Sequence, residues 1–330
     1  MQRNQIIDIA KGIGIFLVVI GHISIPPIMH RFIYLFHMPL FFFISGYLFN
    51  YMPERLKLMN RKWNRLIIPI LLYSVFLIPF YILFANKGCI FALNSTIVLQ
   101  SIIPFNYDIP LWFAPVLFLV ILFSNEILRY GKVCKYVLIG ALFIIVQLNI
   151  MGRIPHIPYV SKTFLASIFF LMGYFAKQYF RQGVQNTTLY HRIISITISI
   201  MVLAIMTKSH IDFDMSKFET CENLIVVLLS SASGIVCVMG MSSFFAKSKL
   251  LSTCLSFLGR HSFPVFCLHW PIIKVANNIF PPPFWGCIHL DNLPYFIMRW
   301  VILLVLMTIF IFVVEKCYRN LFPKYFHANC

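Results

Sequence analysis

The chain has 330 residues, of which 60% are hydrophobic and only 11% are charged. Soluble domains carry about a quarter charged residues because their surface faces water, so this composition excludes a soluble enzyme, and the apolar excess excludes a disordered chain. The 27 Lys and Arg residues against 10 Asp and Glu give a net charge of +17, which loops at an anionic membrane surface explain without a nucleic-acid partner. We therefore expect an integral membrane protein.

Apolar runs of about 20 residues can cross the roughly 30 Å hydrocarbon core of a bilayer as helices. Uninterrupted runs such as residues 141–145 exclude the alternating strands of a membrane β-barrel. Ten segments of this kind lie between charged or proline-rich breaks, at residues 9–25, 33–49, 66–85, 110–128, 136–150, 163–179, 193–207, 223–245, 263–280 and 296–315. The sequence thus predicts an all-α bundle of about ten transmembrane helices, with interhelical loops at residues 50–65, 86–109 and 208–222.

Lys and Arg residues are distributed unevenly between alternate loops of this predicted bundle. The loops on the side of the two chain ends hold 19 of them, and the opposite loops hold six. Cytoplasmic loops carry the excess of positive charge, so both termini are predicted to be cytoplasmic, in a multi-pass protein of the inner cell membrane. No linker or internal repeat divides the chain, and residues 1–330 are expected to form a single membrane-embedded domain.

The nine cysteines show no sign of a metal site or a disulfide framework. No two of them have the two-residue separation typical of zinc ligands, and most lie inside apolar segments. They are typical of reduced core residues, and we expect no metal cofactor.

Three ionisable residues share one face of the first predicted span. His22 lies eleven residues after Lys11, about 16 Å along a helix and within about 20° of the same face, and Asp8 lies near that stripe. Ionisable groups in a bilayer usually face a bundle interior or a wet cavity, which favours a functional site. A second interpretation stays open, in which Asp8 and Lys11 pair at the interface and His22 meets a backbone carbonyl. Gly14 and Gly21 share a face suited to close helix packing.

A second histidine, His37, begins the next predicted span. Because the first helix runs outward and the second returns, His22 and His37 are predicted to lie at similar depth, where their imidazoles can converge. On its own, His37 is more typical of a satisfied interface histidine beside a kink at Pro39. Metal ligation is disfavoured because no carboxylate lies nearby in the sequence at that depth.

Cations precede the third predicted span. Arg61 and Arg65 are four residues apart and share a helical face if the helix begins before the membrane, which gives a forked donor pair suited to phosphate. Arg55 and Lys57 are more typical of a solvated cytoplasmic loop. Trp112, His269 and Trp270 add polar or aromatic groups within spans, and aromatic belts account for most tryptophans in such positions.

Together these residues resemble the membrane-bound acyltransferase-3 family of O-acyltransferases. The likeness rests on Asp8-Ile9-Ala10-Lys11-Gly12 running into Val18-Val19-Ile20-Gly21-His22, a basic residue and a histidine separated by ten positions. It continues in Phe36-His37-Met38-Pro39-Leu40-Phe41-Phe42, Ser45-Gly46-Tyr47, the stretch from Arg61 to Pro69, Leu111-Trp112-Phe113, Gly173-Tyr174 and Leu268-His269-Trp270-Pro271. The basic position is Lys11 where many members have Arg, which lessens the scope for bidentate phosphate contact there.

The resemblance implies transfer of an acetyl or other acyl group, such as succinyl, from cytoplasmic acyl-CoA to a hydroxyl of a sugar or cell-surface polysaccharide. The chain is similar to the short, single-domain form of the family, since it ends soon after the last predicted span. Acceptor binding is then expected to fall to the helices and outer loops. The remaining partners expected are the lipid bilayer and the acyl donor.

The predicted mechanism assigns His22 as general base, because an imidazole titrates near about 6.5, close to working pH. His37 is expected to orient it or to hydrogen-bond the reacting groups. Lys11, Arg61 and Arg65 are expected to bind the CoA phosphates. Direct transfer and an acetyl-histidine intermediate on His22 both stay open. The alternative function is a transporter or flippase of a glycan intermediate that uses the histidines as a proton relay.

Overall fold

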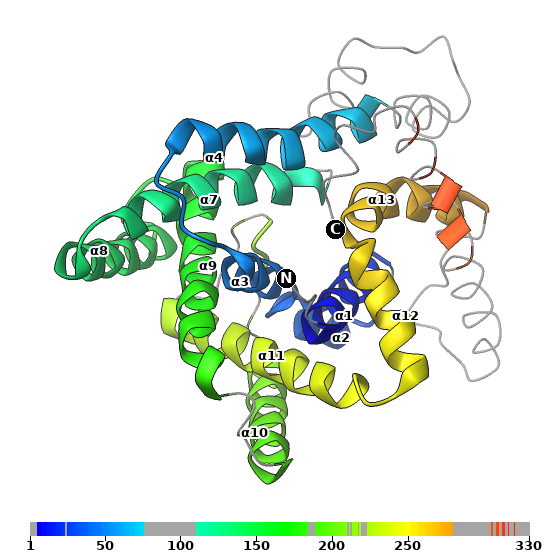
Figure 1. The fold of residues 1–330 in the computed structure, drawn as a ribbon. Coiled ribbons are helices and arrows are strands. Elements are labelled where there is room, and N and C mark those ends of the chain that lie inside the picture. The colour runs from blue at the N-terminus through cyan, green and yellow to red at the C-terminus, as the bar shows by residue number, and fades with distance from the viewer. Residues whose placement is uncertain are drawn as a thin grey trace. The chain divides into compact units, whose positions relative to one another are not determined.

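The computed structural model describes residues 5–23, 25–75, 110–183, 189–209, 211, 213–216, 218, 223–279 and the isolated positions 305, 308, 309, 312, 313, 316 and 320. Among these residues every regular element is a helix (Figure 1). In chain order they are α1 (Gln5–Gly21), α2 (Pro27–Tyr34), α3 (His37–Leu48), α4 (Arg55–Lys62), a π-helical turn η1 (Trp63–Ile67), a 3₁₀ turn η3 (Pro110–Trp112), α7 (Phe113–Arg129), α8 (Lys132–Ile150), α9 (Pro158–Gly183), α10 (Leu189–Lys208), α11 (Leu224–Phe245), α12 (Lys249–Arg260) and α13 (Ser262–Ile279).

Predicted spans that fall on described residues coincide with helices α1, α3, α7 to α11 and α13. The third predicted span, residues 66–85, is helical up to residue 75, and its remainder lies outside the described residues. The tenth, residues 296–315, lies almost entirely outside them, as does the predicted loop 86–109.

Two predicted loop regions are helical in the structure. The stretch 50–65 was expected to be an interhelical loop, but α4 begins at Arg55 and continues through η1 into the helix that reaches residue 75. Residues 249–260, which no predicted span covered, form α12. The buried face of α12 consists of Ser252, Ser256 and Gly259, so the helix packs through small residues and a search for apolar runs does not find it.

Five helical segments among the described residues are long and apolar enough to cross a membrane, namely Pro27–Leu48, Lys132–Ile150, Pro158–Tyr179, Tyr190–Lys208 and Leu224–Phe245. Helices α1 and α7 have 17 residues each, or about 26 Å at 1.5 Å per residue. The chain is thus a helical membrane protein with several apolar spans. The count of about ten spans and the cytoplasmic position of both termini stay predictions.

The helices pack into two compact units that interleave along the chain. The first comprises residues 1–18, 27–59 and 116–260, and the second comprises residues 19–26, 60–115 and 261–330. Each unit therefore draws on segments far apart in the sequence. The expectation of a single membrane domain over residues 1–330 stays a prediction.

Helices α3 and α9 form the closest pair in the first unit and lie side by side in Figure 1. A Cβ atom at Gly46 of α3 would overlap the Phe170 carbonyl of α9, and one at Gly173 of α9 would overlap the Phe43 carbonyl of α3. Only glycine allows the two backbones to approach this closely. This contact holds α3, and with it His37, against the centre of the unit.

Helices α1 and α12 approach each other in the same way within the first unit. A Cβ atom at Gly12 would overlap the Leu255 carbonyl, and one at Gly259 would overlap the Asp8 carbonyl. The packing role predicted for Gly14 is confirmed, since a Cβ atom there would lie 3.0 Å from a side chain of α3. Tight packing therefore fixes the half of α1 that carries Asp8 and Lys11.

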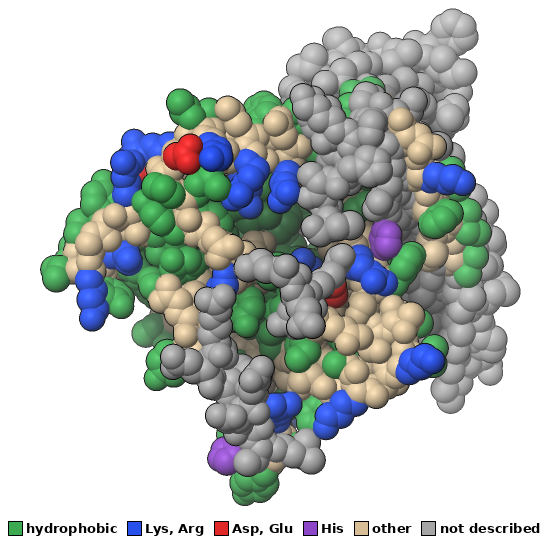
Figure 2. Space-filling view, viewed as in Figure 1, with side chains coloured by type: hydrophobic (Ala, Val, Ile, Leu, Met, Phe, Trp, Pro, Cys, Tyr) green, Lys and Arg blue, Asp and Glu red, His purple; other side chains and the backbone are tan. Residues whose placement is uncertain are grey.

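Helices α8 and α10 are mostly exposed, in contrast to α3 and α9. Only 17% of the apolar stretch of each of these two helices is buried inside the protein, against 61% of the apolar stretch of α9. Their exposed side chains are large and apolar, including Val133, Ile144, Ile198, Met201 and Ile205. Figure 2 shows such hydrophobic surface over α8, at the left of the view. In a membrane protein, a helix face of this composition suits contact with lipid chains.

Candidate active site

His22 directly follows the last turn of α1 and is half-buried. Its backbone N–H donates to the Val19 carbonyl at 3.2 Å, so the residue is still tied to the helix end. Pro26 and Pro27 follow a few residues later, and a proline disfavours helical geometry at the residue that precedes it. The sequence therefore ends α1 here and leaves the imidazole at the helix terminus.

The His22 ring packs against two aromatic side chains of α13, all within the second unit. The centroids of the His22 and His269 rings lie 5.0 Å apart with 33° between the ring planes. The centroid of the Trp270 ring lies 5.4 Å from that of His22, nearly perpendicular to it at 77°. His269 and Trp270 are consecutive residues, so one turn of α13 supplies both contacts.

His269 is fully buried and its tautomer follows from its contacts. Its Nδ1 lies 2.8 Å from the Phe266 carbonyl and 3.2 Å from the Val265 carbonyl. Because a carbonyl oxygen can only accept a hydrogen bond, Nδ1 carries the hydrogen and Nε2 has the free lone pair. That buried Nε2 has no hydrogen-bond partner among the residues that the structure describes.

His37 lies in the first turn of α3 and is buried. Its Nδ1 donates to the Ile33 carbonyl at 2.9 Å, and its ring lies 4.7 Å from that of Tyr34. The charge of Asp214, in the connection after α10, acts on both Tyr34 and His37. One ring nitrogen is thus satisfied by a carbonyl, as the interface interpretation of His37 expected. His37 belongs to the first unit and His22 to the second, so their convergence stays a prediction.

Arg61 and Arg65 are exposed on one continuous helical segment, the end of α4 and the π turn that follows. Arg61 and Arg65 were predicted to share a face if their helix begins before the apolar span that starts at residue 66. The helix begins at Arg55, so this condition is met. Between them, Lys62 is half-buried, and its pKa falls from 10.5 to about 8, first through burial and then through repulsion by Arg61 and Arg65. Figure 2 shows Lys and Arg side chains gathered along this part of the chain, at the top of the view. This basic turn, Arg61 to Arg65, repels further positive charge and suits an anion.

The remaining predicted site residue, Lys11, is half-buried on α1. Asp8, one turn earlier, is buried, with its backbone against Gly259 of α12. Lys11 and Asp8 belong to the first unit, whereas the basic turn belongs to the second. A joint phosphate site of Lys11, Arg61 and Arg65 therefore stays a prediction.

Comparison with protein families identifies the chain. The model of the acyltransferase-3 family, described as an acyltransferase domain, matches residues 4–316, nearly the whole sequence. The chain belongs to the acyltransferase-3 family. No curated protein and no solved structure matches it. The resemblance stated from its motifs is thus confirmed, and it is a multi-pass membrane protein of an acyltransferase family.

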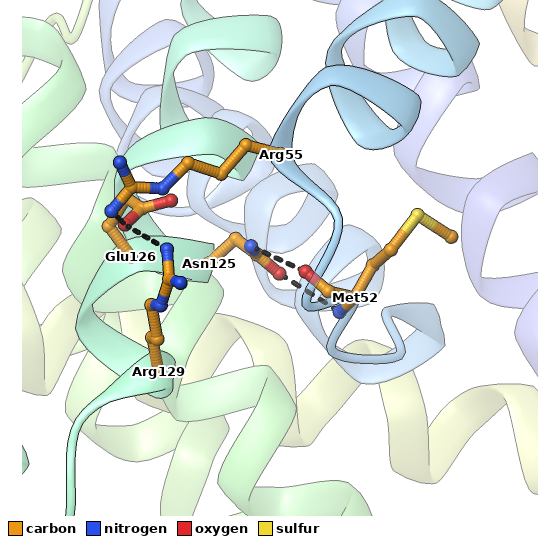
Figure 3. A network of polar contacts seen from close by, with 5 residues as sticks. All are labelled: Met52, Arg55, Asn125, Glu126 and Arg129. Carbon is orange, nitrogen blue, oxygen red and sulfur yellow. Dashed lines mark hydrogen bonds and ion pairs between the residues drawn. The ribbon is translucent and has the colours of Figure 1, made fainter.

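A polar network fixes the start of α4 in this acyltransferase (Figure 3). Asn125 of α7 is buried, and its side chain exchanges two hydrogen bonds with the backbone of Met52, at 3.1 and 2.9 Å. Arg55 at the start of α4 pairs with Glu126, which also lies 3.8 Å from Arg129. All five residues belong to the first unit, and the helix they anchor continues into the basic turn.

The motif reading missed two features of the acyltransferase. It placed His269 and Trp270 within a span but assigned His269 no role, although a histidine in an apolar span was a signal. It also missed the link from Asp214 to Tyr34 and His37, for which the sequence offers no local signal. Within the residues that the structure describes, no group of three or more His, Cys, Asp and Glu side chains is placed to hold a metal ion.

Proposed function

We propose that this protein transfers an acetyl or other short acyl group from cytoplasmic acyl-CoA to a hydroxyl of a sugar or cell-surface polysaccharide. The match to the acyltransferase-3 family over residues 4–316 carries this proposal. The family supplies the reaction class, and the donor, the acceptor and the inner-membrane location are our proposals. The packed imidazole of His22 and the basic turn are the features of the structure that support them.

His22 acts as the general base in this proposal. A neutral hydroxyl is a weak nucleophile, and an imidazole can take its proton near neutral pH. As the hydroxyl oxygen bonds to the thioester carbonyl carbon, its proton passes to His22. The carbon–sulfur bond then breaks, and the CoA thiolate takes the proton from the imidazolium. A two-step route, in which His22 itself carries the acyl group, requires the same residue.

His37 plays a supporting part in the proposal. Its Nδ1 is held by the Ile33 carbonyl, so the ring orientation is fixed and Nε2 points away from that contact. A fixed nitrogen of this kind can hydrogen-bond the acceptor or orient the base.

The donor phosphates bind Arg61 and Arg65, with Lys11 as the third cation. Guanidinium groups bind phosphate oxygens through paired hydrogen bonds, and Arg is suited to this task. Burial is the main cause of the lowered pKa of Lys62, and repulsion by Arg61 and Arg65 adds to it; this repulsion supports the assignment, because a bound anion relieves it. The acyl-pantetheine arm would then extend from the basic turn toward His22.

The reaction is tested with the full chain in lipid nanodiscs, radiolabelled acetyl-CoA and surface polysaccharide from cells that lack the protein. Label in the polysaccharide with release of free CoA supports the proposal. No transfer of label beyond the protein-free control would contradict it. The same protein in proteoliposomes separates the transporter alternative, since movement of glycan without loss of the thioester would identify a carrier.

A further inference from the structure

His269 is a buried titratable group that the proposed reaction does not use. Its side chain is fully buried, and Nδ1–H is committed to the Phe266 and Val265 carbonyls. This leaves the lone pair of Nε2 as its single unsatisfied position among the described residues. A buried acceptor without a partner costs free energy, so its retention calls for an explanation.

The ring of His22 is the polar group packed nearest to that lone pair by the described contacts. The centroids of the two rings lie 5.0 Å apart, with 33° between the ring planes. His22 is half-buried at a helix end, and two carbonyl contacts hold the ring of His269. Two imidazoles whose centroids lie 5.0 Å apart are close enough for a ring N–H of one to donate to a ring nitrogen of the other.

We propose that His269 is a positioning residue for His22, which its Nε2 orients by accepting a hydrogen bond from one ring nitrogen of His22. The inference rests on the proposed function, in which His22 is the base. With one His22 nitrogen held as a donor, the other must carry the lone pair, and it is this nitrogen that faces the acceptor hydroxyl. No proton moves to His269, which stays neutral throughout.

This arrangement performs the task that the carboxylate performs in a Ser-His-Asp triad. It fixes the tautomer of the base and stabilises the imidazolium that forms when the base takes a proton. A neutral acceptor suits a buried site, where a carboxylate would require a second charge to balance it. Trp270, which follows His269 in the sequence, packs nearly perpendicular to the His22 ring.

Few other titratable groups surround the pair among the described residues. Cys267 lies on α13, and Tyr73 lies on the helix that the structure describes up to residue 75, with its ring centroid 6.3 Å from that of Phe263. The turn η3, which packs against α13, contributes Leu111 and Trp112 and no charge.

Two substitutions at position 269 separate the positioning role from a purely structural one. Asn places an amide N–H near the Nδ1 position and keeps the bond to the Phe266 carbonyl, but has no atom at the Nε2 position. Gln places an amide oxygen near the Nε2 position and gives up the Nδ1 contact. The proposal predicts that His269→Asn lowers kcat about 10- to 100-fold with KM for acetyl-CoA unchanged, whereas His269→Gln retains more activity. It also predicts that the acidic limb of the kcat profile of His269→Asn moves to lower pH.

A structural role predicts the opposite order, with His269→Asn close to wild type and His269→Gln impaired, and this order would overturn the proposal. Ser74→Ala is the control, since it removes a buried hydrogen bond to the Ile70 carbonyl on another helix of the same unit. Thermal unfolding of each variant in nanodiscs shows whether it is folded. Equal kcat and pH profiles for wild type and His269→Asn would overturn the inference alone. Absence of transfer by the wild type would instead overturn the proposed function.

Discussion

The α3–α9 pair and the basic turn are opposite kinds of region. In the first, Gly46 and Gly173 bring two backbones into contact and exclude both water and lipid. In the second, Arg61 and Arg65 are exposed and charged, and they repel each other and Lys62. The difference indicates that substitutions in the helix pair act on folding, whereas substitutions in the basic turn act on the binding of a charged ligand.

The largest effect is expected where the backbones touch. Gly173→Ala forces a Cβ into the Phe43 carbonyl, and overpacking of this kind costs about 1–3 kcal/mol of unfolding free energy. Gly140→Ala on α8 is the matched control, because nothing lies within 4 Å of a Cβ there and Ala favours a helix. Thermal unfolding of the purified variants measures both. Equal melting temperatures would mean that the α3–α9 contact is not tight.

Replacing both Arg61 and Arg65 by Ala should leave the fold intact and weaken CoA binding. Loss of two charge-assisted phosphate contacts corresponds to a rise in Kd of about 10-fold or more. Lys57→Ala is the control, since Lys57 lies exposed on α4 and pairs with Glu54 at 3.2 Å. Isothermal titration with CoA gives the Kd values. An unchanged Kd for the double variant would remove the phosphate role from the basic turn.

A smaller, pH-dependent effect is expected from Lys62. Because its pKa is lowered to about 8, it carries its charge at neutral pH and loses it as the pH rises through that value. CoA binding should therefore weaken a few-fold from about pH 7 to about pH 9, and Lys62→Arg should remove this dependence because Arg stays charged. The unfolded chain keeps the proton up to about 10.5, so this residue also makes folding more favourable as the pH rises from about 8 to 10.5. Titration at several pH values tests the first statement, and a Kd independent of pH would contradict it.

The smallest effect is expected at the ion pair between Arg55 and Glu126. The Arg55 side chain is 61% exposed, and exposed ion pairs contribute about 0–1 kcal/mol. Arg55→Gln should therefore shift the melting temperature little and leave the Kd for CoA unchanged. A large loss of stability would show that the network in Figure 3 anchors α4 more firmly than its exposure suggests.

Much of the helical framework was predictable because the apolar runs are continuous and end at charged residues. The predicted span 223–245 and helix α11, Leu224–Phe245, differ by one residue. Helix α12 was missed because its buried face is Ser252, Ser256 and Gly259, which hydropathy does not distinguish from a loop. Helix α4 was missed because its surface is rich in charged side chains, which are typical of a loop. The four-residue spacing of Arg61 and Arg65 was its one helical signal in the sequence.

For the candidate site, the sequence could point to residues within one segment but not to contacts between distant segments. His22 and the cations could be proposed from the sequence because ionisable groups at or within an apolar helix are conspicuous. The contact of His22 with His269 joins residues far apart in the chain, and no local pattern encodes such a pairing. The same holds for the electrostatic influence of Asp214 on His37, since the two residues lie far apart in the sequence.

The most direct test of the account is the rate of acyl transfer by His22→Gln, measured beside His191→Gln, a change at an exposed histidine of α10. Both proteins are compared with the wild type in nanodiscs with radiolabelled acetyl-CoA and the polysaccharide acceptor, after thermal unfolding has shown that they are folded. We predict that His22→Gln lowers kcat at least about 10²-fold while CoA still binds, because the base is gone, and that His191→Gln transfers at the wild-type rate. Transfer at the wild-type rate by folded His22→Gln would contradict the assignment of His22 as the base.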